Sequence, residues 1–162
     1  LYANPVTRTE IFSGKFSANM LLYGITLLIV LLIGSAAAYI FGIRDIQNLV
    51  LVMLQIFICL LLLGFEFLSI GFFYSSISSR SSHAEGGSFL LYIAIFLIWA
   101  VLTGIGGNLL TISGLFPFSA LNPLNMVMGS GFEWIGIIVN IVIGVLFWVI
   151  GCMIYKSKEL KF

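Results

Sequence analysis

The stretch MLLYGITLLIVLLIGSAAAYIF, residues 20–41, decides the fold class. It contains no charged side chain, and about 20 apolar residues in a helix are enough to cross about 30 Å of hydrocarbon. Similar apolar runs follow at about 49–73, 89–107 and 134–155. We therefore predict an all-α polytopic membrane protein whose residues 1–162 form a single transmembrane domain with four transmembrane helices.

The composition of the whole chain supports this prediction. Of 162 residues, 61% are hydrophobic and 8% are charged, and the mean hydropathy is +1.20. A soluble domain is about 45–50% apolar. The formal net charge of +1 leaves no basic surface for nucleic acid, so we exclude that partner. Cys59 and Cys152 lie in apolar runs as packing residues, no Cys/His cluster has metal-site spacing, and no cofactor is expected.

The segment 108–133 is apolar but is broken by Pro117, Pro123 and several glycines. It is too interrupted to form a span, so we expect short helices in the membrane interface. Orientation follows from lysine and arginine, which are enriched on the cytoplasmic side. One side has Arg8, Lys15, the loop YSSISSRSSHAEGG with Arg80, and Lys156, Lys158 and Lys161, whereas the other has only Arg44, beside Asp45. Both ends, including the tail 156–162, are therefore predicted to be cytoplasmic, and segment 108–133 external.

A polar helix start precedes the first apolar run. Thr7 is a candidate N-cap with Glu10 at the third helical position, the pattern of a capping box. Val6 and Ile11 have the spacing of a hydrophobic staple, and Gly14 permits a bend before the span. This capped, amphipathic segment is either an anchor in the interface or a contact helix for a cytoplasmic partner.

Four motifs along the chain resemble one family of membrane proteins. They are NPVTRTEIFSGKF at 4–16, GFFYSSISSRSSHA at 71–84, LNPLNMV at 121–127 and YKSKEL at 155–160. In this order they resemble the permease subunits of the type-two ABC transporter family (ABC-2). Each motif alone is weak, but together they cover essentially the whole chain.

The resemblance implies a mechanism and partners. It implies that Thr7, Arg8, Glu10 and Lys15 belong to a cytoplasmic coupling segment, residues 1–16, which touches a separate ATP-binding subunit. It also implies a homodimer or a pairing with a related permease. Such permeases have six helices, so the four predicted here would be the last four, and the other two would precede Leu1.

Few residues suggest chemistry within the chain. No phosphate-binding loop of the form GxxxxGK[S/T] is present, so any ATPase would be a separate polypeptide. His83 is expected in the polar loop without a catalytic partner. Glu66 is an ionisable residue inside the second span, where such groups are costly and suggest function. It is either a structural carboxyl within the bundle or part of a translocation path or gate.

Small residues predict where helices pack. Gly136, Asn140 and Gly144 recur every four residues on the fourth span, a spacing that permits close helix packing, and Asn140 can supply an interhelical hydrogen bond. We interpret these residues as a packing seam.

The sequence therefore favours a permease subunit that couples ATP hydrolysis elsewhere to transport, without an ATPase site of its own. The spans lack charged linings, which favours export of a lipidic or amphipathic cargo. The expected location is the cell membrane of a prokaryote. The alternative is a membrane anchor or scaffold subunit that does not transport. An intramembrane enzyme is disfavoured, because no paired acids, nucleophile–base pair or metal ligands appear at one membrane depth.

Overall fold

The computed structural model describes residues 7–41, 46–79, 81–128 and 132–157, and within these ranges every regular element is a helix. The helices are α1 Arg8–Ile40, α2 Ile46–Ile77, α3 Ser81–Ile105, α4 Leu109–Ser113, α5 Pro117–Ala120, α6 Pro123–Val127 and α7 Trp134–Ser157. Four of them, α1, α2, α3 and α7, are long and apolar enough to cross a membrane. The predicted all-α fold with four such helices is confirmed.

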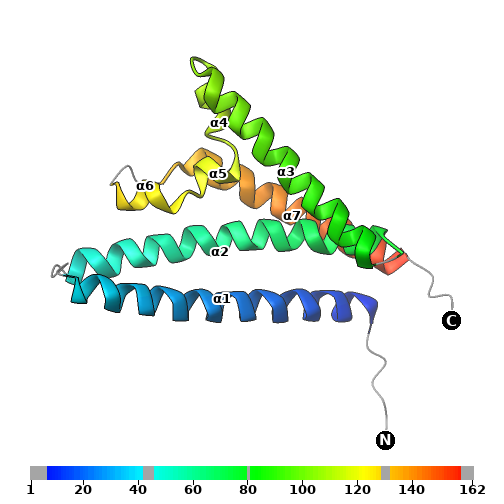
Figure 1. Cartoon of the computed structure of the whole chain (residues 1–162). Helices are drawn as coiled ribbons and strands as arrows, with labels where there is room; N and C mark the ends of the chain where they lie inside the picture. Colours follow the sequence, from blue (N-terminus) through cyan, green and yellow to red (C-terminus); the bar gives the residue numbers. More distant parts are fainter. Residues whose placement is uncertain (1–6, 42–45, 80, 129–131, 158–162) are drawn as a thin grey trace, which may run out of the picture.

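Helix α2 is the centre of the bundle. It packs against α1, α3, α6 and α7. Figure 1 shows α1 and α2 side by side and antiparallel, while α3 leaves the bundle at an angle and leads to α4. The start of α1, the end of α2, the start of α3 and the end of α7 lie at one end of the bundle, and α4, α5 and α6 lie away from it (Figure 1). The chain thus enters and leaves the bundle on the same side.

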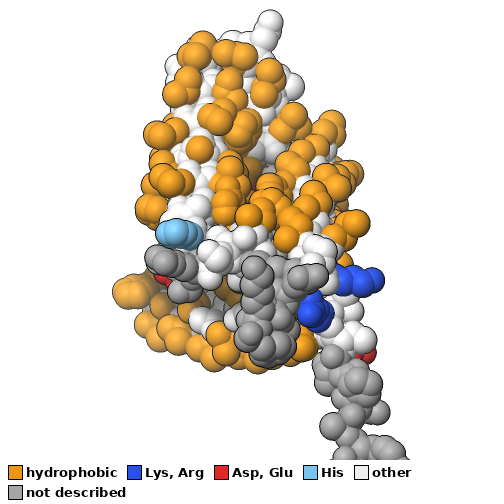
Figure 2. Space-filling view, turned by 90° about the vertical axis from the view of Figure 1, so that its right-hand side faces the viewer, with side chains coloured by type: hydrophobic (Ala, Val, Ile, Leu, Met, Phe, Trp, Pro, Cys, Tyr) orange, Lys and Arg blue, Asp and Glu red, His pale blue; other side chains and the backbone are white. Residues whose placement is uncertain are grey.

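The outer faces of the long helices are apolar. On α1, Leu22 is 67% exposed and Ile33 is 66% exposed, and the most apolar stretch of α3 has no buried residue. Figure 2, which looks onto the end where α1 begins, shows hydrophobic side chains over most of this face, with Lys and Arg gathered on one side. Such a surface is stable only against hydrocarbon or another apolar helix.

The capped segment is part of the first long helix. Gly14, where the sequence permits a bend, lies inside α1, which runs unbroken for 33 residues. A Cβ atom at Gly14 would meet nothing within 4 Å, so no close contact requires a glycine there. From Arg8 onward, the segment expected to couple to a partner is therefore continuous with a helix long and apolar enough to span a membrane.

The serine-rich stretch is mostly helical, not a loop as the sequence analysis expected. Tyr74–Ile77 belong to α2, and α3 begins at Ser81, so that His83 lies in the first turn of α3. The helices continue beyond the apolar runs, and short side chains there bond to their own backbone. For example, the Ser76 hydroxyl donates to the carbonyl of Phe72 at 2.8 Å.

The proline-broken segment 108–133 forms three short helices, α4, α5 and α6. Gly106 and Gly107 have φ angles of 73° and 62°, which end α3 in the left-handed region that glycine tolerates. Pro117 and Pro123 are the first residues of α5 and α6, where the missing N–H costs nothing. These residues explain why the described part of this segment turns repeatedly instead of forming one long helix.

Candidate functional site

The first turn of α1 is a capping box. The backbone N–H of Glu10 donates to Oγ1 of Thr7 at 3.3 Å, and the backbone N–H of Thr7 donates to Oε2 of Glu10 at 2.7 Å. Two backbone donors that a helix start leaves unpaired are thus satisfied, and the Glu10 carboxylate lies at the positive end of the helix dipole. The predicted capping box is confirmed, whereas Val6 of the predicted staple lies outside the described residues.

The same turns have one polar and one aromatic face. Thr7, Glu10 and Lys15 are exposed and Arg8 is half-buried, whereas Phe12 and Phe16 are buried. The structure therefore places the four residues expected to touch a partner at the start of α1, three of them exposed and Arg8 half-buried. This start lies at the end of the bundle where α7 ends (Figure 1). No contact to another chain is part of the structure, so their role stays a prediction.

Phe12 and Phe16 belong to an aromatic cluster that joins α1, α2 and α7. The ring centroids of Phe12 and Phe72 are 5.4 Å apart with an interplanar angle of 88°, and those of Phe16 and Phe65 are 5.8 Å apart at 87°. Phe16 and Trp148 are 6.2 Å apart. Edge-to-face pairs of this kind add about 0.5–1.5 kcal/mol each beyond the burial of the rings. The polar turns are thus fixed to two other helices.

We expect Thr7→Ala to destabilise the start of α1, because the Thr7 hydroxyl is the acceptor for the Glu10 amide. Loss of such a cap costs about 1 kcal/mol. Faster hydrogen exchange of the first-turn amides would report it. Thr7→Ser keeps the hydroxyl and is the matched control. Equal exchange in both variants would mean that the cap does not hold this turn.

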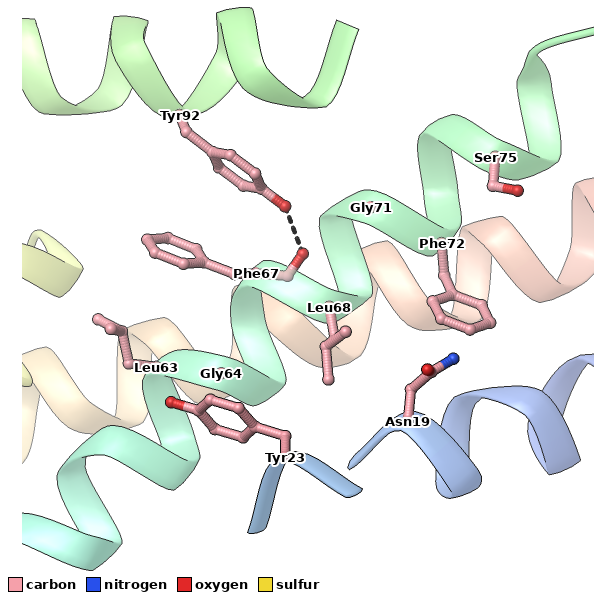
Figure 3. Close-up of a pocket in the computed structure, with 10 residues that line it drawn as sticks. All are labelled: Asn19, Tyr23, Leu63, Gly64, Phe67, Leu68, Gly71, Phe72, Ser75 and Tyr92. Atoms are coloured by element: carbon pink, nitrogen blue, oxygen red, sulfur yellow. Dashed lines mark hydrogen bonds between the residues drawn. The ribbon is translucent and has the colours of Figure 1, made fainter. Parts of the chain in front are cut away.

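A pocket of about 520 Å³ opens between α1, α2 and α3. Figure 3 shows residues from all three helices around it: Asn19, Tyr23, Leu63, Gly64, Phe67, Leu68, Gly71, Phe72, Ser75 and Tyr92. The Tyr23 hydroxyl donates to the carbonyl of Leu60 at 2.8 Å, and the Tyr92 hydroxyl donates to the carbonyl of Phe67 (Figure 3). The walls are mostly apolar, with a few hydroxyl and amide groups, and none of the lining residues is charged.

Tyr23 lies directly against Gly64. A Cβ at Gly64 would overlap the Tyr23 ring, whereas one at Gly71 would be 3.7 Å from the Tyr92 hydroxyl. Gly64 therefore lets Tyr23 of α1 approach the backbone of α2, whereas the position of Gly71 has room for a Cβ.

Glu66 does not line this pocket. It is 2% exposed and faces a second, smaller cavity of about 190 Å³ that Asn140 of α7 also lines. Oε2 of Glu66 has no hydrogen-bond partner in the structure. Whether the carboxyl takes part in translocation or gating stays a prediction. Its burial beside α7 agrees with a carboxyl that faces an inward cavity.

Gly136, Asn140 and Gly144 are all buried on one face of α7, but they meet different neighbours. A Cβ at Gly136 would be 2.6 Å from the Gly114 carbonyl oxygen, in the turn after α4. Asn140 Nδ2 donates to the carbonyl of Leu115 at 3.0 Å and to that of Gly136 at 2.7 Å. A Cβ at Gly144 would be 2.8 Å from the Phe65 ring of α2. One stripe on α7 therefore packs against both α2 and the segment 108–133.

Sequence reasoning missed several residues of these sites. Phe12 and Phe16 have the four-residue spacing of one helix face, a signal that was present but is common in apolar chains. Tyr23 and Tyr92 stand alone in apolar runs and gave no signal for a shared pocket. Gly151 extends the α7 stripe, and its Cβ would be 3.1 Å from the Phe73 backbone.

Among the residues that the structure describes, no three His, Cys, Asp or Glu side chains lie close enough to bind one ion. Cys59 is buried, Cys152 is half-buried, and both are free thiols.

The long apolar helices and the buried polar groups between them define a multi-pass helical membrane protein. A family model described as "ABC-2 family transporter protein" matches residues 1–160. The chain belongs to the ABC-2 transporter family, as its motifs indicated. The comparison with curated proteins gave no match, and neither did the comparison with solved structures.

Proposed function

We propose that this chain is the membrane permease of an ATP-driven exporter and that the polar first turns of α1 receive the force from a separate ATP-binding subunit. As an ABC-2 family member, the chain is a membrane component of a transporter, and such components typically lack an ATPase domain. Force transmission requires an exposed contact that is rigidly joined to moving helices.

The single observation that supports this contact best is the pairing of a capping box with buried phenylalanines in the same turns of α1. The cap fixes the helix start that contains Thr7, Arg8 and Glu10, and Lys15 follows in the same helix. Phe12, one turn further on, packs at 5.4 Å from Phe72 of α2 and at 5.5 Å from Tyr155 of α7. A push on the cap therefore reaches three helices without an intervening hinge.

The proposed orientation follows from the same end of the bundle. The described basic residues of the long helices, Arg8, Lys15 and Lys156, lie in the first turns of α1 and the last turn of α7. These helix ends meet on one side (Figure 1). Basic residues favour the cytoplasmic side. We therefore propose that this side faces the cytoplasm, where it meets the ATP-binding subunit, and that α4–α6 face the outside. We propose that the membrane is the cell membrane of a prokaryote.

The proposed cargo is lipidic or amphipathic. The pocket between α1, α2 and α3 has apolar walls formed by residues such as Leu63, Leu68 and Phe72, with the tyrosine hydroxyls at its edge (Figure 3). Such a lining suits an alkyl or aromatic moiety and offers an ion no compensating charge. The apolar outer faces of α1 and α3 suit lipid contact or a second permease, either another copy or a related chain.

The test is to copurify the full-length protein in mild detergent and to compare charge variants. We expect a Walker-type ATPase to copurify with the wild type, and Arg8→Glu and Lys15→Glu to release it or to uncouple ATP hydrolysis from transport by tenfold or more, since about 1.4 kcal/mol of lost contact energy changes binding tenfold.

Two changes at Glu10 separate charge from capping. Glu10→Gln keeps an acceptor for the Thr7 amide but removes the charge, whereas Glu10→Ala removes both without adding a positive charge. If only Glu10→Ala releases the ATPase, the cap matters; if both do, the charge matters. If no ATPase copurifies and every variant behaves as wild type, the chain is an anchor or scaffold subunit instead.

A further inference from the structure

The cavity beside Glu66 lies at the junction of α2, α7 and the segment 108–133. Its volume is about 190 Å³, and it is lined by Glu66, Ile70, Ile95, Leu115, Phe116, Pro117, Val139, Asn140, Ile143 and Phe147. Eight of these ten side chains are apolar. The two polar ones, Glu66 and Asn140, are among the most buried residues of the chain, at 2% and 1% exposed.

Both polar side chains have an unpartnered oxygen. Oε2 of Glu66 and Oδ1 of Asn140 are buried and have no hydrogen-bond partner. The amide nitrogen of Asn140 is already used, because it donates to the carbonyls of Leu115 and Gly136. Two acceptor oxygens cannot satisfy each other, so the site needs a proton on the carboxyl, a bound donor, or both. Buried polar groups rarely stay unpaired in folded proteins.

Packing brings the two side chains to the same level. A Cβ at Gly144 would be 3.4 Å from Cα of Glu66, and one at Gly151 would be 3.1 Å from Cα of Phe73. From the first contact to the second, the chain advances by seven residues on α7 and by seven on α2, so the two helices run parallel here. Helical side chains lean toward the start of their helix. The Glu66 carboxyl therefore leans from the level of Gly144 toward that of Asn140, one turn earlier.

The charge state of Glu66 follows from its neighbours. The titratable groups on α1 and α3 near this part of α2 are the phenols of Tyr23 and Tyr92, and both donate to backbone carbonyls of α2. On the α7 side the cavity has Asn140 and apolar side chains, and the residues lining it from segment 108–133 are apolar. No described basic side chain lines the cavity. An ionised carboxylate there would be an uncompensated buried charge, which is strongly unfavourable.

We propose that this cavity is a binding site for water, in which bound water links a protonated, neutral Glu66 to Oδ1 of Asn140. The carboxyl O–H donates to the water, and the water donates to Asn140, so that both unpartnered oxygens are satisfied. The volume is ample for water, and the site provides the polar partners that a buried water needs. This site rests on the contacts above and does not depend on the proposed transport function.

The link would join three parts of the bundle through one residue. Asn140 is on α7, its amide nitrogen holds the carbonyl of Leu115, and its oxygen reaches α2 through the water. Deprotonation of Glu66 would place a charge at this junction and favour opening of the cavity toward solvent. The position of α7 and of segment 108–133 against α2 would then depend on one proton.

Infrared spectroscopy of the full-length protein in lipid nanodiscs tests the proton and the water. At neutral pH we expect a carboxylic acid C=O band in the wild type that is lost in Glu66→Gln. In Asn140→Leu the band is expected to remain but to shift to higher frequency. An O–H band that moves in H₂¹⁸O and disappears in Asn140→Leu would report the bound water. If Glu66→Gln removes only carboxylate absorption, Glu66 is charged and the proposal is overturned; without the H₂¹⁸O-sensitive band, the water link is wrong.

A double-mutant cycle tests the link itself. We expect Glu66→Leu and Asn140→Leu each to raise the unfolding equilibrium constant about tenfold, the usual effect of removing one partner of a buried polar pair. In the double variant, the change in the unfolding equilibrium constant is expected to be about threefold or more smaller than the product of the two single changes. Ser69→Ala is the matched control, because the buried Ser69 hydroxyl bonds within α2 to Phe65 at 2.7 Å. In the variant that combines Ser69→Ala with Asn140→Leu, the change in the unfolding equilibrium constant should equal the product of the two single changes. A cycle in which Glu66 and Asn140 also act independently contradicts the proposal.

Discussion

Gly136→Ala is expected to destabilise the bundle by about 1–3 kcal/mol, the cost of overpacking a tight interior. The new Cβ would be 2.6 Å from the carbonyl oxygen of Gly114 and 2.5 Å from Cβ of Ala120. The carbonyl belongs to the backbone and cannot rotate away as a flexible side chain would. Helix α7 must therefore move off the segment 108–133, which also stretches the bond from Asn140 to Leu115. Unfolding by SDS in mixed micelles, followed by tryptophan fluorescence, measures the loss.

The matched control for Gly136 is Gly34 in α1. A Cβ at Gly34 would meet nothing within 4 Å. Alanine there is expected to leave the free energy of unfolding unchanged or to raise it by up to about 1 kcal/mol, because alanine is the better helix former. If both variants lose the same stability, replacing any glycine in these helices is destabilising, and the close approach at Gly136 is not the cause.

Phe12→Ala is expected to cost about 3–5 kcal/mol, the usual range for removing a buried phenylalanine. Phe12 is 3% exposed, and its ring contacts Phe72, Trp148 and Tyr155 on two other helices. Its loss would leave a cavity where α1, α2 and α7 meet. The free energy of unfolding in SDS mixed micelles measures the effect. If the proposed coupling is right, ATP hydrolysis by the purified transporter should also continue without transport.

Ile11 provides the comparison for Phe12. It is the preceding residue on the same turn but is 38% exposed. Ile11→Ala is expected to cost much less than Phe12→Ala, since little surface leaves a packed interior. Phe12→Leu keeps part of the buried area and should recover part of the stability. A Phe12→Ala variant as stable as Ile11→Ala would show that the aromatic cluster does not fix the capped turn.

The sequence predicted the helices well because lipid imposes a simple rule. Residues 20–41 contain no charge, so their backbone polar groups can only be satisfied within a helix. The capping box at Thr7 and Glu10 was equally predictable, since its partners are three residues apart. Helix ends were harder: the helices extend into the serine-rich stretch that looked like a loop, where the Ser76 hydroxyl bonds to a carbonyl of its own helix.

Contacts between distant residues could not be predicted in the same way. Glu66 was identified as costly, but that it shares a cavity with Asn140 depends on the parallel packing of α2 and α7. The stripe Gly136, Asn140 and Gly144 was found by its spacing, yet the spacing did not tell that Gly136 meets segment 108–133 and Gly144 meets α2. Which helices pair is set by shape across the whole bundle, and no local pattern encodes it.

The unbroken length of α1 has a consequence for the lipid around it. Its 33 residues measure about 50 Å at 1.5 Å per residue, whereas the hydrocarbon layer is about 30 Å thick. Helix α7, with 24 residues, measures about 36 Å. The excess length of α1 must be taken up by tilt or by projection beyond the headgroups. Bilayers with longer or shorter acyl chains should therefore change how far the Thr7 cap stands above the membrane.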